Sequence, residues 1–177
     1  MEKWRDSSIV FSGKIVRLRK GTVVLDDGTL GYREVVEHSG GACILPFTGT
    51  DFVFVRQYRI ALEKFVLEAP AGKLEVGEMP KQCAIKELRE ETGFEAKQVV
   101  SLGGIYASVG YCNELIHLYL ALDLTQLGTR LEPEERIEPV HRSIELVRKQ
   151  VADFSFEDSK TAVVAQRALA WLDRAKN

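Results

Sequence analysis

The chain lacks the features that would place it in a membrane or on nucleic acid. No apolar run approaches the length that spans a bilayer, and the N-terminus MEKWRDSSIV has no apolar core of a signal peptide. Lysine and arginine number 24 against 26 aspartates and glutamates, a net charge of −2. Because no excess of positive charge favours polyanions, we expect no nucleic-acid partner and no membrane partner.

Cysteine is also scarce. The 3 cysteines, Cys43, Cys83 and Cys112, are odd in number, scattered and without a CxxC pair. Cys43 lies in an apolar run and Cys83 in an amphipathic one, so both are expected to be small core residues. This usage favours a reducing compartment, and we expect a cytoplasmic protein.

What the chain has is enough apolar residues for one substantial core, with 45% hydrophobic residues in a length of 177. Strands are expected at residues 14–19, 22–25 and 30–36, with Asp27-Gly28 as a hairpin turn. Together they form a small N-terminal antiparallel β unit, residues 1–38, that is too small to hold a core by itself. The main domain is then residues 39–177.

Further strand signals follow in the main domain. They lie at 42–45, 52–55, 66–67, 103–107, 115–122 and around Val140. The continuous apolar run 52–55 predicts a strand buried on both faces. A helix is expected from about Ile144 with Ser143 as its N-cap, and a last helix at 159–175 carries an apolar stripe. The chain has no internal repeat, low-complexity tract or flexible linker.

The clearest chemistry lies between Gly72 and Phe94, which reads GKLEVGEMPKQCAIKELREETGF. Glu87, Glu90 and Glu91 are spaced i, i+3, i+4, so on a helix they project from one face within about 100° of arc. Like charges packed in this way repel, and a hard divalent cation would turn the repulsion into a binding site. The alternative is a solvated acidic helix face, but it leaves the preceding Gly72 and Glu78 unexplained.

The same stretch contains signals for where its helix begins and ends. Pro80 suits the first helical turn, where its missing N–H costs nothing. Gly93 is a natural left-handed cap at the other end. Between them an apolar stripe beside the glutamates anchors the helix on a core; it consists of Ala84, Ile85 and Leu88.

The spacing resembles the Nudix box, G-x5-E-x7-R-E-U-x-E-E-x-G-U, where U is apolar. Every motif position matches except the arginine, which is Lys86 here. The resemblance implies an α+β Nudix fold: an α/β/α sandwich with a mixed β-sheet, beside the small N-terminal antiparallel β unit. It also implies an enzyme that depends on Mg²⁺, for which Mn²⁺ can substitute.

Segments outside the box resemble one branch of the Nudix hydrolases, the ADP-ribose pyrophosphatase and nucleoside diphosphate sugar hydrolase branch. These segments are residues 38–41, 56–59, 67–72, 108–114 and 158–161. The resemblance implies hydrolysis of ADP-ribose or other nucleoside diphosphate sugars to a nucleoside monophosphate and a sugar phosphate. It also implies a homodimer in which the N-terminal β unit packs on its neighbour.

One departure bears on the substrate. Members directed at ADP-ribose usually have a Ser-Pro-Gly step where this chain has Ser108-Val109-Gly110. The departure favours a broader range of nucleoside diphosphate sugars, hexose conjugates included, with ADP-ribose kept among them.

The resemblance also implies roles for box residues. Glu87 and Glu91 are expected to bind Mg²⁺ directly, and Glu90 to bridge or to bind a second metal. The carbonyl of Ala71 is expected as a further ligand, and Gly72 lets the backbone approach metal and phosphate closely. Two metals could hold the substrate oxygens and lower the pKa of a bound water.

The general base is expected on the acidic loop 131–137. Glu135 is the matching position, with Glu134 and Glu132 as competitors, and each of them could instead be a solvated loop residue. If the loop does not supply the base, Glu90 on the metal-binding face is the first alternative, ahead of Glu78 and Glu114.

Basic residues outside the box are expected at the substrate. Arg59 can clamp a phosphate because its guanidinium binds two oxygens at once. Arg56 is a second candidate that could instead pair with an acidic neighbour, and Glu114 could support the metal or orient a loop. Lys86 keeps the charge of the motif arginine but lacks its planar fork, so it braces a box carboxylate more loosely.

The sequence leaves two alternative functions open. A non-catalytic nucleotide-sugar sensor would fit the fold, although no box carboxylate is lost. A Nudix hydrolase of other nucleoside diphosphate derivatives, such as dinucleoside polyphosphates, is the second, and the segments around Arg59 and Gly110 argue against it.

Overall fold

The computed structural model describes residues 1–129, 131 and 136–175. The chain forms two compact units. Unit 1 consists of Met1–Gly40 and Tyr106–Leu115, and unit 2 consists of Gly41–Ile105 and Ile116–Asn177. Among the described residues, no helix is both long and apolar enough to cross a bilayer.

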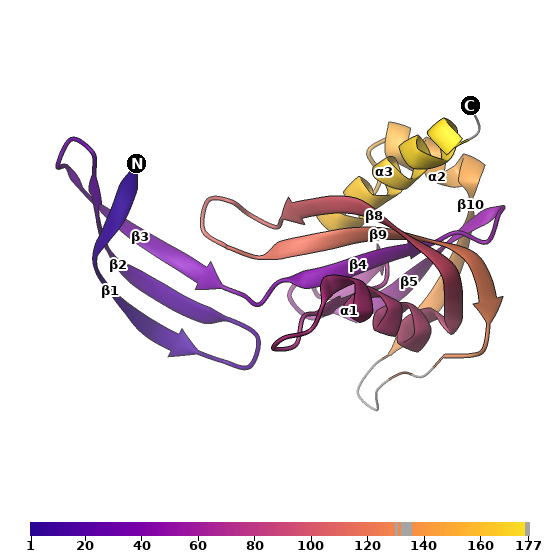
Figure 1. Cartoon of the computed structure of the whole chain (residues 1–177), viewed down its shortest axis with the longest axis horizontal. Coiled ribbons are helices and arrows are strands. Elements are labelled where there is room, and N and C mark those ends of the chain that lie inside the picture. Colours follow the sequence, from indigo (N-terminus) through magenta and orange to yellow (C-terminus); the bar gives the residue numbers. More distant parts are fainter. Residues whose placement is uncertain (130, 132–135, 176–177) are drawn as a thin grey trace. The chain divides into compact units, whose positions relative to one another are not determined.

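Unit 1 is built on an antiparallel sheet of β1 (Glu2–Ser12), β2 (Arg17–Leu25) and β3 (Leu30–Glu37), in the order β1-β2-β3 (Figure 1). The predicted hairpin joins β2 to β3, and Gly28 has a left-handed φ of 83° there. Residues 14–19 and 22–25 were predicted as two strands, but Arg17–Leu25 is one continuous strand.

The polar segment that forms β1 gave no strand signal in the sequence. It lies at the edge of the sheet and pairs with β2 along its length, with register shifts at Trp4/Asp6 and Ile9/Phe11. Pairing with an existing neighbour, rather than intrinsic propensity, therefore accounts for this strand.

Unit 2 contains two sheets. One has the order β10-β5-β6 and the other the order β7-β4-β9-β8. Their strands are β4 (Gly41–Pro46), β5 (Asp51–Arg59), β6 (Lys64–Glu68), β7 (Ala71–Lys73), β8 (Phe94–Tyr106), β9 (Leu115–Gln126) and β10 (Ile137–Ser143). Because β4 pairs parallel with β9 and antiparallel with β7, the second sheet is mixed, as predicted.

Helices cover these strands on opposite faces. They are α1 (Pro80–Glu87), α2 (Ile144–Ala152) and α3 (Ser159–Ala175), and the π-helical turn η1 (Leu88–Thr92) continues directly from α1. Helix α1 lies on one side of the strands, and α2 and α3 lie on the other (Figure 1).

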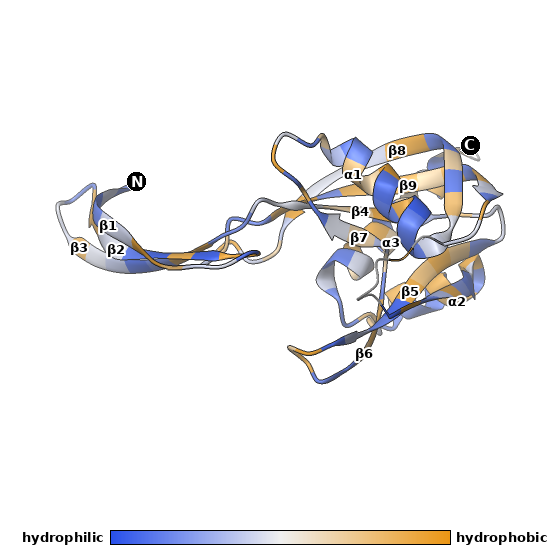
Figure 2. Ribbon diagram, turned by 90° about the horizontal axis from the view of Figure 1, so that it is seen from below, coloured by the Kyte–Doolittle hydropathy of each residue, from blue (hydrophilic) through white to orange (hydrophobic). Residues whose placement is uncertain are grey.

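Alternate residues of each central strand belong to different cores. Ala42 and Ile44 of β4 pack in the cluster that contains Cys83 and Leu88, whereas the intervening Cys43 packs in the cluster of α2 and α3. The same alternation runs through β5 and β9, which Figure 2 shows as strongly hydrophobic within unit 2. The predicted α/β/α sandwich is thus confirmed, and the run 52–55 is buried on both faces as expected.

The predicted helix boundaries are confirmed where a cap defines them. Pro80 occupies the first turn of α1, and Ser143 caps α2 by accepting the Leu146 N–H at 3.2 Å. Gly93 has the left-handed φ of 75° expected of a cap. The expectation of an α-helix through all three box glutamates was wrong, since the α-helix ends at Glu87 and a π turn carries Glu90 and Glu91.

Candidate functional site

Two buried carboxylates lie against one short stretch of backbone in unit 2. Glu87 at the end of α1 and Glu91 in η1 expose only 8% and 3% of their surface. The N–H of Ala71 donates to Oε2 of Glu91 at 3.1 Å. A Cβ on the neighbouring Gly72 would overlap the carboxylate of Glu87. Glycine at this position is therefore what lets β7 lie against the glutamate pair.

The π turn fixes where the glutamates point. A π turn inserts one residue into the helical repeat through i→i+5 bonding, and such turns often occur at functional sites. Its end is held firmly, because Oγ1 of Thr92 donates to the Leu88 carbonyl at 2.5 Å. At Gly93 a Cβ would strike the backbone of Gly128, and the Gly93 carbonyl accepts the N–H of Leu127 at 2.8 Å. Glu90 lies half-buried on the same turn.

Lys86 places a positive charge beside Glu87. Its Nζ lies 3.7 Å from Oε1 of Glu87. Burial alone would lower the pKa of Lys86, but the charge of Glu87 and of further glutamates outweighs burial and raises it. The ammonium therefore stays charged beside the box, as a point charge rather than a bidentate fork.

This donor set fits a hard divalent cation. Within the described part of the chain, no group of three or more histidine, cysteine, aspartate and glutamate side chains is gathered as a metal cluster. Mg²⁺ does not need one, because it is commonly held by one or two carboxylates together with waters and substrate phosphates. Glu87 and Glu91, two buried carboxylates beside the same backbone, meet that requirement.

Arg59, the predicted phosphate clamp, makes its recorded hydrogen bonds to a carboxylate of the protein. Its Nε and Nη2 donate to the two oxygens of Glu68 at 2.6 and 2.8 Å. Lys160 donates to the same carboxylate and also to Asp158 at 2.9 Å. Burial would raise the pKa of Glu68, but the hydrogen bond from Arg59 and the charge of Lys160 lower it below its usual range. These residues form a part-buried ion network at the end of β6.

Arg56 and Glu114, the other predicted substrate residues, contact Glu138 and His38 respectively. Arg56 is 3.7 Å from Glu138 and lies over the ring of Phe65, 4.6 Å from its centroid. Glu114 belongs to unit 1, with Oε1 3.4 Å from Nδ1 of His38. The same Nδ1 also accepts the Gly40 N–H at 3.0 Å. Glu132, Glu134 and Glu135 lie outside the described residues.

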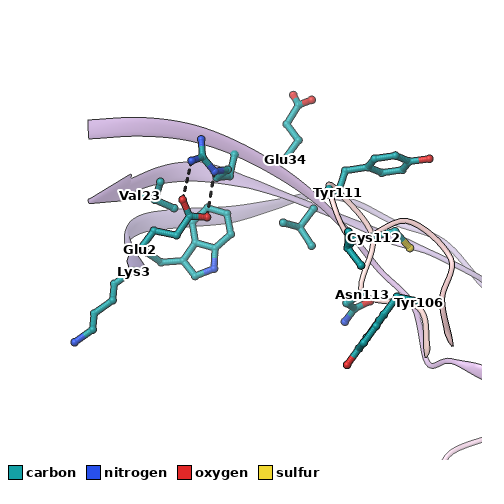
Figure 3. A pocket seen from close by; sticks show the side chains of 13 residues that line it. Glu2, Lys3, Val23, Glu34, Tyr106, Tyr111, Cys112 and Asn113 are labelled. Atoms are coloured by element: carbon teal, nitrogen blue, oxygen red, sulfur yellow. Dashed lines mark hydrogen bonds and ion pairs between the residues drawn. The ribbon is translucent and has the colours of Figure 1, made fainter. Parts of the chain in front are cut away.

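Unit 1 has a hollow of its own, about 500 Å³ in volume. Figure 3 shows Tyr106, Tyr111 and Asn113 on one side of it and Glu2 with Lys3 on the other. Trp4 and Val23 add apolar surface, and an ion pair between Arg33 and Glu2 at 2.7 Å borders it. The hollow therefore combines aromatic surface with a few polar groups.

Sequence reasoning missed the residues that support the Ala71–Gly72 backbone. Sγ of Cys83 lies 3.7 Å from the Gly72 carbonyl as a weak donor, and burial raises the pKa of this thiol to about 12. The hydroxyl of Thr161 accepts the Ala69 N–H at 2.8 Å. The segment 158–161 entered the sequence analysis only through a family resemblance, since no local pattern shows which strand a helix terminus will meet.

Comparisons with known proteins agree with this geometry. The NUDIX domain matches residues 37–167. The chain is 37% identical over 160 residues to the ADP-ribose pyrophosphatase of Bacillus subtilis (strain 168), covering 89% of this chain and 86% of that protein. It is 36% identical over 168 residues to the methanol dehydrogenase activator of Bacillus methanolicus, covering 93% and 91%.

Two further comparisons add a GDP-mannose pyrophosphatase and a solved structure. The chain is 34% identical over 148 residues to the GDP-mannose pyrophosphatase of Salmonella typhimurium, covering 75% of this chain and 74% of that protein. A crystal structure of an ADP compounds hydrolase superimposes with a TM-score of 0.86 at 18% identity, covering 98% and 95%.

Proposed function

The chain belongs to the Nudix family, and on that premise we propose that it hydrolyses the pyrophosphate bond of nucleoside diphosphate sugars. The products are a nucleoside monophosphate and a sugar phosphate. The observation that carries the proposal is the placement of two buried carboxylates, Glu87 and Glu91, against the Ala71–Gly72 backbone. Relatives that act on ADP-ribose and on GDP-mannose support a substrate range that includes both kinds of sugar.

We assign Mg²⁺ as the cofactor, with Mn²⁺ as a substitute. Glu87 and Glu91 would hold the cation, Glu90 would bridge to it or serve a second one, and the Ala71 carbonyl would complete the protein ligands. When bound, the cation neutralises charge on the diphosphate and lowers the pKa of a bound water. Gly72 keeps the backbone clear of Glu87, and Lys86 balances part of the negative charge.

We assign the removal of the water proton to Glu135, with Glu134 and Glu132 and then Glu90 as the alternatives. Arg59 is assigned to a substrate phosphate through the donors that remain once Nε and one Nη2 hydrogen are engaged by Glu68. Arg56 and Glu114 are assigned to substrate binding as weaker candidates than Arg59.

We propose a homodimer because unit 1 does not bury enough apolar surface by itself. Val23 is the one apolar side chain of unit 1 that is buried. Its edge strand β1 is long, which favours pairing or packing with another chain. We therefore propose that unit 1 packs on a second copy of the chain and lends residues to its substrate site. We assign the dimer to the cytoplasm, since Cys43, Cys83 and Cys112 are all free thiols.

A second candidate function is the activation of another enzyme, favoured by the activator from Bacillus methanolicus at 36% identity over 93% of this chain. The two functions are separated by whether the isolated chain turns over a nucleotide sugar.

The test is a panel of ADP-ribose, ADP-glucose and GDP-mannose incubated with the purified chain and Mg²⁺. Products are resolved by chromatography, and the same reactions with EDTA serve as the metal control. We expect a nucleoside monophosphate and a sugar phosphate in equal amounts, formed only with metal. No turnover of any member would refute the hydrolase proposal and favour the activator or the sensor.

A further inference from the structure

The segment from Ala69 to Gly72 runs from the end of β6 into β7, and three other elements hold it by hydrogen bonds. The N–H of Ile44 in β4 donates to the Pro70 carbonyl at 2.9 Å. Glu91 of η1 accepts the Ala71 N–H. The third contact comes from the first turn of α3, where Oγ1 of Thr161 accepts the Ala69 N–H at 2.8 Å.

The Thr161 hydroxyl donates a hydrogen bond to one partner and accepts one from another. Its side chain is fully buried, and Oγ1 lies 2.5 Å from Oδ2 of Asp158, which also accepts the Thr161 N–H at 3.0 Å. An ionised carboxylate only accepts hydrogen bonds, so the hydroxyl proton points to Asp158. A lone pair is thereby left for the Ala69 N–H, so donation runs from Ala69 through the Thr161 hydroxyl to Asp158.

The neighbours of Thr161 and Ala69 are also in contact with each other. Lys160, beside Thr161, forms an ion pair with Glu68, beside Ala69. Two consecutive residues of α3 therefore hold Glu68, the last residue of β6, and Ala69, which follows it. Because Ala69 is 1% exposed, loss of the hydroxyl would leave its N–H buried without this partner.

We propose that Thr161 is a positioning residue for the metal site. It fixes the start of the segment whose next residues, Ala71 and Gly72, face Glu91 and Glu87. The hydrogen bonds of Thr161 go to Asp158 and the Ala69 N–H, so its effect reaches these carboxylates through the backbone. The inference rests on the proposed function for the presence of a cation, but not for the identity of the substrate.

The test measures Mn²⁺ binding without substrate, by titration calorimetry and by the free Mn²⁺ signal in electron paramagnetic resonance. Thr161→Val keeps the shape and removes the hydroxyl, and Thr161→Ser keeps the hydroxyl. Loss of an outer partner of a metal site typically weakens affinity by about 10- to 100-fold. We expect Thr161→Val to weaken Mn²⁺ binding by about 10-fold or more, and Thr161→Ser to stay near wild type.

Ser143→Ala is the matched control, because it removes a hydroxyl cap from α2 on a helix that carries none of the box. Unchanged Mn²⁺ affinity in Thr161→Val would overturn the proposal, and so would an equal loss in Ser143→Ala, which would indicate general destabilisation. If Thr161→Val does not fold, Thr161→Ser is compared with Thr161→Ala, which lacks the hydroxyl. Equal Mn²⁺ affinities of these two variants would then overturn the proposal. A wild-type chain that hydrolyses no nucleotide sugar, with the Mn²⁺ pattern as expected, would refute the proposed function and leave the positioning role standing.

Discussion

Units 1 and 2 hold their strands together by different means. In unit 2 every central strand is covered on both faces by helices, and Phe52, Phe54 and Leu118 are fully buried. In unit 1 the sheet buries only Val23 among its apolar side chains, while Trp4 and Tyr111 stay 40% and 59% exposed. Its strands are held by backbone pairing and by surface ion pairs such as that of Arg33 with Glu2.

The difference indicates where each function can reside. Chemistry that needs buried carboxylates in a fixed geometry requires a packed core around it, and the glutamate pair lies in unit 2. An exposed aromatic hollow on a thin sheet suits contact with a partner or with a planar group of the substrate. We therefore expect substitutions in unit 2 to change chemistry and folding, and those in unit 1 to change association.

The largest effect is expected from Glu91→Gln in unit 2. It removes one of two buried carboxylates at the proposed cation site while keeping the shape and the acceptor for the Ala71 N–H. We expect kcat to fall by about 10³-fold, the upper end of the loss seen when a stabiliser of transition-state charge is removed. Steady-state kinetics with circular dichroism checks this, and Glu75→Gln, on the exposed loop before α1, is the control. Full activity of Glu91→Gln would rule out the metal role.

The proposed base comes next in size. Glu135→Gln should lower kcat by about 10²- to 10⁴-fold, the usual contribution of a general base, with little change in KM. Mn²⁺ affinity should stay at the wild-type value because Glu87 and Glu91 remain. Wild-type kcat in Glu135→Gln, Glu134→Gln and Glu132→Gln alike would move the base to Glu90.

The two units should also differ in their contribution to stability. Phe54→Ala in the core of unit 2 should reduce the free energy of unfolding by about 3–5 kcal/mol, because it leaves a cavity in a fully buried site. Phe11→Ala in unit 1, where Phe11 is 56% exposed, should change it by about 0.5 kcal/mol or less. Denaturant unfolding measures both, and equal losses would contradict the contrast between the units.

The ion network of unit 2 gives the stability a dependence on pH. The pKa of Glu68 is lowered from 4.5, so its stabilising contribution is complete above about pH 4.5 and is lost as the pH falls through the lower, folded-state pKa. Glu68→Gln should cost about 3–5 kcal/mol at neutral pH, because Arg59 and Lys160 lose a buried partner. Thermal unfolding should be measured from about pH 3 to about pH 7, a range that spans that pKa. The melting temperature of the variant should fall less steeply with decreasing pH than that of wild type.

Sequence alone predicted much of unit 2 and less of unit 1. Caps and buried runs are local signals, which is why Pro80, Ser143 and the strand at 52–55 were predicted correctly. Strand β1 has no such signal, because its pairing with β2 is what makes it a strand. The π turn was missed because a spacing of i, i+3, i+4 fits an α-helix equally well.

Within the candidate site, the motif identified Glu87, Glu91 and Gly72, which the structure brings together. It could not identify Thr161, because a contact 92 residues away in the sequence depends on how α3 meets β6. Similarly, the pattern showed that Arg59 can bind two oxygens, but not that Glu68 would provide both.

Trp4→Ala should have the smallest effect on folding, and it is the sharpest test of the difference between units 1 and 2. Trp4 lines the hollow of unit 1 and is 40% exposed, so its removal should change the free energy of unfolding by about 0.5 kcal/mol or less. If unit 1 packs on a second copy, a tryptophan in that contact is the kind of residue whose truncation costs about 2 kcal/mol or more of binding. The dimer dissociation constant should then rise by about 10-fold or more, measured by sedimentation velocity across a dilution series.

Phe154→Ala removes an aromatic side chain of unit 2 that is 92% exposed and serves as the control. A wild-type chain that is monomeric at micromolar concentration and fully active would show that unit 1 needs no partner.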